Sequence, residues 1–129
     1  MIIHLNTIYK SKLIFKKKIF PCQLGKNGKV PNYKKIEGDK CTPIGRFVIE
    51  SIFLRKDKKL NIPFKRSIKN KIFFIRKNYG WCDDIDSKKY NQLVNLNPKF
   101  NYSYEKLHRC DDVYDIIIEL NYNKNPTIR

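Results

Sequence analysis

The sequence predicts a mainly β protein with long irregular loops and little helix, in a single domain spanning residues 1–129. Three observations support this prediction. Short runs of isoleucine, valine and aromatic residues recur along the chain, separated by glycine, proline, asparagine and lysine. No stretch has the apolar spacing of a long amphipathic helix. A length of 129 residues suits one domain with a real core and is too short for two.

Two strands are expected near the N-terminus, Ile2 to Ile8 and Leu13 to Phe20, joined by a hairpin turn at Lys10 to Lys12. The second of these runs is β-branched and aromatic. Residues 22–24 are expected to extend a strand, and the glycines of Gly25 to Gly28 are expected to turn the chain.

The stretch Glu37 to Phe47 concentrates turn residues ahead of an apolar run. Gly38 and Gly45 are free to adopt positive φ or to let backbone approach closely, and Pro43 fixes its own φ. We expect a shaped loop that feeds a strand over Ile44 to Leu54. Loops of this kind serve as plain turns or carry function, so this segment needs the rest of the chain to interpret it.

The second half of the chain contains fewer apolar runs. Arg55 to Leu60 is expected to be a basic connector and Lys71 to Lys77 a short strand. Residues 78–112 are polar and aromatic, so they are expected to be irregular but ordered, since disordered segments are poor in aromatics. The run Val113 to Tyr122 is the clearest core strand.

The formal net charge of +16 invites a nucleic-acid interpretation. The chain is also rich in lysine, isoleucine and asparagine and lacks alanine, the pattern of an AT-rich gene, so lysine is expected as a default surface residue. The basic clusters lie on several connectors and strands, which favours solvated faces over one binding surface and makes nucleic acid an unlikely partner. These clusters are Lys16 to Lys18, Lys34-Lys35, Arg55 to Lys59 and Lys65 to Lys71.

Four widely spaced cysteines, with no Cys-x-x-Cys pair, argue against a zinc ribbon or thioredoxin-like site. Cys22, Cys41, Cys82 and Cys110 are therefore expected to be either two disulfides or four free thiols. His108 with Cys110, and His4 with Cys22, are the His/Cys pairings close in sequence. Neither is followed by a glycine-rich turn suited to an oxyanion hole, so neither is expected to be a nucleophile and its base.

Acidic residues gather at two places in this basic chain. Asp83, Asp84 and Asp86 follow a Gly-Trp-Cys segment, and Asp111-Asp112 precedes the last strand. Such groups suit either a metal or cationic-substrate site, or turns in which a carboxylate accepts nearby backbone N–H groups. The spacing favours turns in both cases.

Three segments carry motifs in a matching order and spacing. The first is Cys22-Gln-Leu-Gly25 followed by Lys35-Ile-Glu-Gly-Asp-Lys-Cys-Thr-Pro-Ile-Gly-Arg-Phe47. The second is Gly80-Trp-Cys-Asp-Asp84 followed by Tyr90-Asn91, and the third is Leu107-His-Arg-Cys-Asp-Asp-Val-Tyr-Asp115 followed by Asn123. Together they resemble the EGDGxTPxGxF, GWCDDP…YN and LxRxDxxYDxxxxxxxN segments of the YkuD-type L,D-transpeptidase catalytic domain. The resemblance covers about Cys22 to Arg129, with Lys40 in place of a frequent glycine and Ile85 in place of a frequent proline.

The resemblance implies a β-sandwich of mixed strands with its active site at one end, and acyl transfer on peptidoglycan stem peptides without cofactor or metal. In the family, a histidine and then a Gly-Cys element follow the strand that Val113 to Tyr122 resembles. That cysteine forms the thioester. None of the four cysteines here matches it, so no catalytic residue is carried over. The residues implied to shape or support the cleft are Trp81, Asp83, Asp84, Tyr90, Asn91, Arg109, Asp111, Tyr114 and Asn123.

We therefore expect residues 1–129 to be the N-terminal portion of such a domain, inactive alone and open to complementation by a C-terminal fragment. The family implies an extracytoplasmic location, yet no secretory signal is present in residues 1–20 and the longest apolar runs are too short to span a bilayer. The compartment stays open. The alternative function is a small basic module that binds nucleic acid or an anionic cell-wall polymer.

Overall fold

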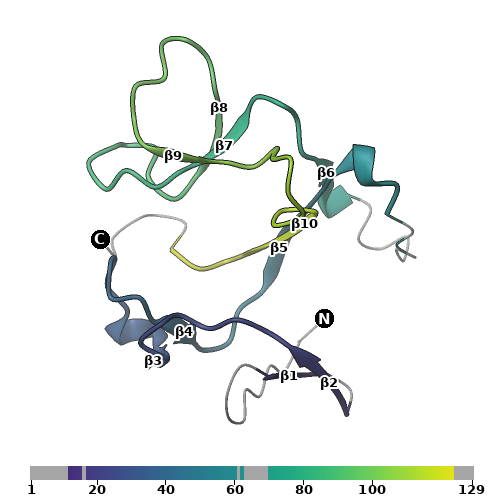
Figure 1. Cartoon of the computed structure of the whole chain (residues 1–129). Coiled ribbons are helices and arrows are strands. Elements are labelled where there is room, and N and C mark those ends of the chain that lie inside the picture. Colours follow the sequence, from purple (N-terminus) through teal and green to yellow (C-terminus); the bar gives the residue numbers. More distant parts are fainter. Residues whose placement is uncertain (1–11, 16, 61, 63–69, 124–129) are drawn as a thin grey trace. The chain divides into compact units, whose positions relative to one another are not determined.

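The computed structural model describes residues 12–15, 17–60, 62 and 70–123, and the described chain is mainly β, as predicted, with ten short strands (Figure 1). Helical structure among these residues is limited to short 3-10 segments. The chain divides into two compact units. Unit 1 contains residues 1–48 and 128–129, and unit 2 contains residues 49–127. Each unit forms its own small sheets, and the expectation that residues 1–129 make one domain stays a prediction.

Unit 1 begins with a hairpin of β1 (Lys12–Phe15) and β2 (Lys18–Pro21), in which Phe15 pairs with Lys18. The prediction of a single strand over residues 13–20 was wrong, because Lys17 adopts a φ of 65° and reverses the chain within the lysine cluster. The predicted strand at residues 2–8 and most of the predicted turn at 10–12 lie outside the described residues.

A glycine turn and a parallel strand pair follow in unit 1. The Gly28 N–H donates to the Gly25 carbonyl at 2.8 Å, which confirms the turn predicted there. Residues 22–24 do not extend a strand. β3 (Lys29–Pro31) leads through the 3-10 turn η1 (Asn32–Lys34) and a loop to β4 (Thr42–Ile44), which pairs with β3 in parallel.

The loop before β4 is organised by the Asp39 carboxylate. One of its oxygens accepts the Cys41 N–H at 2.8 Å, the other accepts the Ile36 N–H at 3.2 Å, and Lys35 Nζ lies 2.7 Å away. The hydrogen bond with Lys35 holds the pKa of Asp39 below its ordinary value. This aspartate turns the glycine-rich stretch into a defined loop by satisfying backbone donors from both of its sides.

The predicted strand over residues 44–54 is divided in the structure. β4 ends at Ile44, and β5 (Ile49–Leu54) begins only after an irregular segment over residues 45–48. A Cβ at Gly45 would lie 3.0 Å from the Asn32 side chain and 3.2 Å from the Phe47 ring. The apolar run is therefore interrupted where the backbone approaches its neighbours closely.

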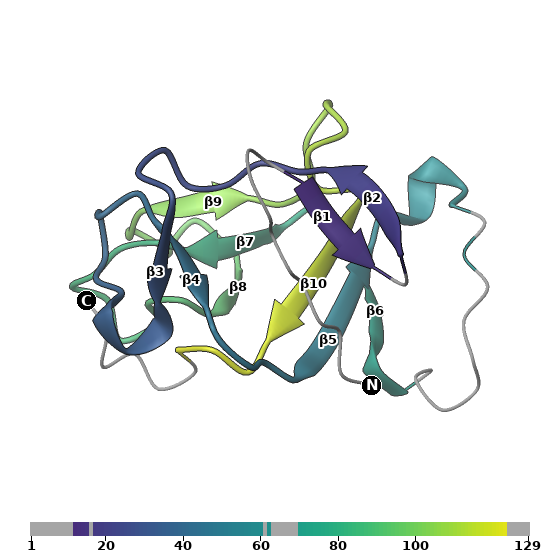
Figure 2. The same ribbon diagram turned by 90° about the horizontal axis from the view of Figure 1, so that it is seen from below.

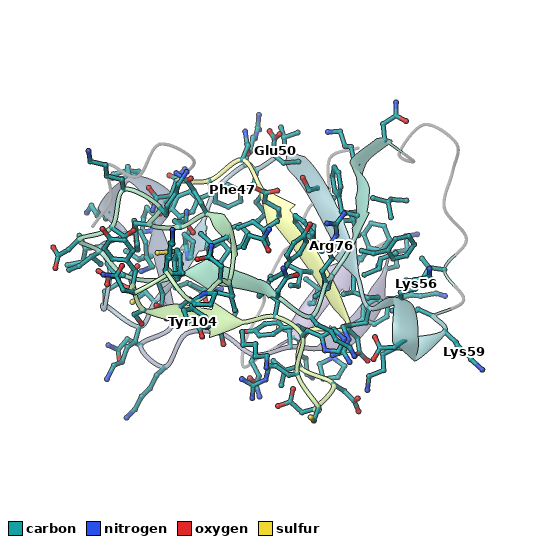
Figure 3. All side chains as sticks on the ribbon, turned by 90° about the horizontal axis from the view of Figure 1, so that it is seen from above. Phe47, Glu50, Lys56, Lys59, Arg76 and Tyr104 are labelled. Carbon is teal, nitrogen blue, oxygen red and sulfur yellow. The ribbon has the colours of Figure 1, made fainter. Side chains whose placement is uncertain are left out.

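Unit 2 contains a sheet of order β10-β5-β6, seen with its strands side by side in Figures 1 and 2. β6 (Ile72–Phe74) pairs with β5 in parallel, and β10 (Ile116–Leu120) pairs with β5 antiparallel. The strands predicted at 71–77 and 113–122 are confirmed with narrower bounds. The connector after β5 contains the 3-10 turn η2 (Lys56–Lys58), where Lys56 and Lys59 are labelled in Figure 3.

A second sheet, of order β8-β7-β9, overturns the prediction that residues 78–112 are irregular. Its strands are β7 (Tyr79–Cys82), β8 (Leu93–Asn95) and β9 (Tyr104–Lys106). They are short, and β9 is exposed throughout, so they lack the apolar alternation that sequence reasoning relies on. Gly80 permits this sheet, because a Cβ there would lie 2.9 Å from the Leu96 side chain and 3.1 Å from the Tyr104 ring.

The core of unit 2 is built around Phe53, Ile75 and Leu107, which are buried. Aromatic and aliphatic side chains from both sheets of the unit pack against these three: Tyr79, Trp81, Leu93, Tyr114 and Ile117. Trp81 and Tyr114, which the motif comparison singled out, therefore also serve as packing residues.

Replacing Gly25 by alanine is expected to destabilise unit 1 by about 2 kcal/mol. The added Cβ would lie 2.2 Å from the Lys40 carbonyl oxygen and 2.7 Å from the Cys41 backbone, and neither backbone group yields easily. Chemical denaturation measures the loss. Gly38→Ala is the control, since a Cβ added there would meet no atom within 4 Å and only the φ of 77° is strained, at a cost of about 1 kcal/mol. Equal losses in the two variants would contradict the close-approach explanation.

Candidate functional site

A chain of side-chain hydrogen bonds joins three of the residues singled out by the motifs. Trp81 Nε1 donates to Asn91 Oδ1 at 3.0 Å, and Asn91 Nδ2 donates to the Asn123 carbonyl at 2.8 Å. These residues lie ten and 32 positions apart in sequence. The Asn91 amide thus uses its acceptor and a donor at once, so it fixes the indole of β7 against the segment that follows β10.

The backbone around Asn91 is shaped to hold this amide in place. Asn91 adopts a φ of 55°, a left-handed conformation that asparagine tolerates better than most residues. Its N–H donates to the Cys82 carbonyl at 2.8 Å, and the Cys82 N–H donates to the Gln92 carbonyl at 3.0 Å. The connection between β7 and β8 is therefore closed at its base by two backbone hydrogen bonds.

Asp84 organises the loop within that connection. Its Oδ1 accepts the Asp86 N–H at 3.0 Å, and its Oδ2 accepts the Ser103 N–H at 3.3 Å. Asp83 contributes its backbone N–H to the Ser103 carbonyl at 3.3 Å and has an exposed side chain. These contacts confirm the turn interpretation of the acidic group. Ser87, which sequence reasoning missed, is fully buried and its Oγ accepts the Lys89 N–H at 3.0 Å.

Tyr90 and Tyr114 lie in packed surroundings. Tyr90 is buried, and its N–H donates to the Ser87 carbonyl at 3.0 Å. Tyr114 packs against the core of unit 2. Its burial, and then the hydrogen bond of its hydroxyl with the Glu105 carboxylate, raise the Tyr114 pKa to about 12. A phenol in this setting stays protonated at neutral pH.

Arg109 and Asp111 form a separate ion pair. Arg109 Nε and Nη2 donate to the Asp111 carboxylate at 3.0 and 2.6 Å. The same carboxylate accepts the Val113 N–H at 3.3 Å, which confirms the turn interpretation of this acidic residue. Both side chains are exposed, so the pair is expected to contribute little to stability. Its two-pronged geometry fixes the Arg109 side chain.

Arg55 is the residue in this region that sequence reasoning assigned wrongly. It was expected in a solvated basic connector, but the side chain is buried. It donates to both oxygens of Asp57, at 2.8 and 2.6 Å, and its Nη1 donates to the Arg109 carbonyl at 2.6 Å. The hydrogen bonds with Arg55 hold the pKa of Asp57 well below its usual range. The apolar run directly before Arg55 was the signal that could have predicted its burial.

Other charged groups gather around this arginine. Lys58 forms ion pairs with Asp112 and, at 3.9 Å, with Asp115. His108 Nε2 lies 3.9 Å from Asp57 Oδ1, beyond hydrogen-bond distance. Within the described part of the chain, no hydrogen bond joins His108 to Cys110, whose thiol is free and exposed, and the expectation that the pair is not catalytic stays a prediction. His4 lies outside the described residues.

The nine residues singled out by the motifs thus fall into distinct groups within unit 2. Trp81, Asn91 and Asn123 are joined by hydrogen bonds, and Asp83 and Asp84 shape the adjoining loop. Arg109 and Asp111 belong to the charged group around Arg55, while Tyr90 is buried and Tyr114 packs against the core. All four cysteines are free. Among residues 12–15, 17–60, 62 and 70–123, no cluster of three potential metal ligands occurs, and no helix is long and apolar enough to cross a membrane.

Comparison with protein-family models, with curated proteins and with solved structures finds no match to this chain. What the arrangement does chemically is therefore judged from its residues. The Trp81–Asn91–Asn123 chain positions backbone and an indole, and its members are neutral donors and acceptors without a nucleophile. It is suited to holding a site in shape.

A double-mutant cycle on Trp81 and Asn91 is expected to show coupling. Trp81→Phe removes the indole donor and should cost about 1 kcal/mol of unfolding free energy. Asn91→Gly keeps the left-handed backbone and removes both amide bonds, so it should cost more. Because the two side chains share one bond, we expect the two losses to be non-additive by about 1 kcal/mol in chemical denaturation. Additive losses would show that this bond contributes no coupling.

The Tyr114 hydroxyl is expected to make stability depend on alkaline pH. The pKa of Tyr114 is raised to about 12 in the folded state and is about 10 in the unfolded chain. The contribution of the hydroxyl to the free energy of unfolding is therefore complete below about pH 10 and is lost as the pH rises toward about 12. Denaturation of the wild type and Tyr114→Phe between about pH 9 and 12 measures this, since phenylalanine keeps the ring. The stability difference between the two proteins should shift in favour of Tyr114→Phe above about pH 10. A pH-independent difference would contradict the prediction.

Proposed function

We propose that this chain is a portion of an L,D-transpeptidase-like domain of the YkuD type, which acts in peptidoglycan cross-linking by acyl transfer through a cysteine thioester. The residues present here form the part that supports the site. The nucleophile and its base belong to a histidine and Gly-Cys segment, and no Gly-Cys dipeptide occurs in these 129 residues. A complementing segment is therefore part of the proposal.

The observation that carries this proposal is the hydrogen-bond chain Trp81–Asn91–Asn123. Its members come from the Gly-Trp-Cys-Asp-Asp segment, the Tyr-Asn pair and the end of the last motif, three places that the resemblance singles out independently of any structure. The side-chain bond between Trp81 and Asn91 gives these two motif residues a physical reason, while Asn123 contributes its backbone carbonyl.

A second observation comes from the departure at Lys40, where the family often has glycine. Lys40 adopts a φ of 56°, a left-handed conformation that favours glycine. The backbone shape that would select glycine is present although the glycine itself is absent. This supports placing Glu37 to Phe47 among the family-like loops.

The proposed role of the hydrogen-bond chain is to hold the site in shape. The complementing segment would supply the chemistry. By holding the β7 indole to the segment after β10, it would give a following active-site strand a rigid neighbour. Stem peptides are the substrate class that the resemblance implies. No metal or cofactor is needed for a thiolate attack on a peptide carbonyl with backbone N–H groups stabilising the oxyanion.

The alternative is a basic module for nucleic acid or anionic cell-wall polymer, supported by the net charge of +16. Several basic side chains in the described residues are engaged by carboxylates instead of being left to face a polyanion. These pairs are Lys35–Asp39, Arg55–Asp57, Lys58–Asp112 and Arg109–Asp111. These four pairs reduce the basic surface open to a polyanion, and the order of the motifs supports the first function.

The proposal is tested by acylation with a carbapenem, read by intact mass. In a complete domain with this chain as its N-terminal portion and the histidine and Gly-Cys segment following it, Asn91→Gly should slow acylation at least tenfold with folded yield preserved. Tyr102→Ala, which changes an exposed tyrosine outside the hydrogen-bond chain, should leave the rate unchanged. The 129-residue chain alone should form no adduct. An adduct on any of its four cysteines, or an unchanged rate in Asn91→Gly, would refute the proposal.

A further inference from the structure

Strand β10 presents backbone polar groups along an edge that no other described strand covers. Its one strand neighbour among the described residues is β5. The Asp115 carbonyl accepts the Arg55 N–H at 3.0 Å, so the polar groups of Asp115 point toward β5. Because this direction alternates along an antiparallel strand, those of Ile116 and Ile118 point away from β5. No hydrogen bond in the described chain engages them there.

The side chains on this edge are apolar and exposed. Ile116, Ile118 and Leu120 alternate on one face of β10, with exposed fractions of 47%, 50% and 37%. Ile116 and Ile118 pair with Leu54 and Ile52 of β5, which pair in turn with Phe74 and Ile72 of β6. The face of the sheet is therefore apolar at these positions and reaches solvent along β10, up to the register shift between Glu119 and Leu120, where Glu50 of β5 lies.

The edge also lacks lysine and arginine, the basic residues that often prevent edge strands from pairing. Natural edge strands are commonly protected by lysine. The chain has 28 lysine and arginine residues, yet residues 112–123, which include β10, contain none. The other edge strand of the same sheet, β6, lies between Lys71 and Arg76. One edge is thus protected by basic residues and the other is not.

We propose that β10 is a dimerisation strand, which pairs antiparallel with β10 of a second copy of this chain about a twofold axis at Ile118. In this register Ile118 faces Ile118 of the second copy, and the outward N–H and C=O of each satisfy those of the other. Ile116 faces Leu120 of the second copy. The two three-stranded sheets become one six-stranded sheet, with apolar side chains facing each other across the new junction.

A second copy of the chain meets no charge conflict along β10 in this register. Glu119 faces Ile117 of the second copy, so no like charges lie directly opposite each other within Ile116 to Leu120. Two chains of net charge +16 repel at long range, and salt screens this repulsion. Dimerisation should therefore strengthen as salt rises. A basic peptide that binds Asp112, Asp115 and Glu119 would instead bind more weakly as salt rises.

The dimer is tested by sedimentation equilibrium of the whole chain at low and high salt. The wild type should show a concentration-dependent dimer that is favoured by salt, and Ile118→Lys should be monomeric with an unchanged circular dichroism spectrum. The matched control is Ile44→Lys, at an isoleucine of similar exposure, 46%, on β4, which should leave the dimer intact.

Disulfide capture tests the register. Opposed residues of a hydrogen-bonded antiparallel pair have Cα atoms about 5.5 Å apart, within disulfide range. Ile118→Cys should form a covalent dimer several-fold faster than Ile44→Cys or the wild type, whose native thiols set the background. A wild type that stays monomeric, a dimer that survives Ile118→Lys, association that weakens with salt, or equal crosslinking of the two cysteine variants would each overturn the proposal.

Discussion

The buried Arg55 guanidinium is the interaction on which unit 2 depends. It engages Asp57 in η2 and the Arg109 carbonyl in the loop before β10, while its own N–H holds the Asp115 carbonyl. A buried guanidinium must have its donors satisfied, because an unmatched charge away from water is strongly unfavourable. The end of β5, the 3-10 turn and the approach to β10 are therefore constrained to one arrangement around this side chain.

The hydrogen-bond chain Trp81–Asn91–Asn123 provides a matching constraint at the far end of β10. Asp115 lies just before this strand and is held by Arg55, while Asn123 lies just after it and is held by Asn91. The strand is thus tied at both ends to parts of unit 2 remote in sequence. One face of β10 packs Ile117 into the core, and the other face carries the exposed isoleucines that we assign to dimerisation.

Left-handed backbone occurs at two residues of the hydrogen-bond chain and in the loop before β4. Asn91 and Asn123 have positive φ angles of 55° and 53°, and Lys40 has 56° in the loop before β4. Such conformations are unfavourable for residues with a Cβ and persist where surrounding bonds hold them. At Asn91, two backbone hydrogen bonds at the base of the β7–β8 connection and two side-chain bonds do so. In the described chain, three of the five non-glycine residues with positive φ thus lie in the motif segments, while Lys17 and Lys59 lie outside them.

The sequence by itself determined the mainly β class, the glycine turn at residues 25–28 and the strands around 72–74 and 116–120. It also determined the turn roles of Asp84 and Asp111. All of these depend on local apolar runs and local turn chemistry. Only the tertiary structure decided the β8-β7-β9 sheet, whose short strands lack alternation, and the burial of Arg55, whose partner at Arg109 lies 54 residues away. It also decided that Trp81, Asn91 and Asn123 meet. Contacts between distant segments depend on how sheets pair and pack, and no spacing within one segment encodes them.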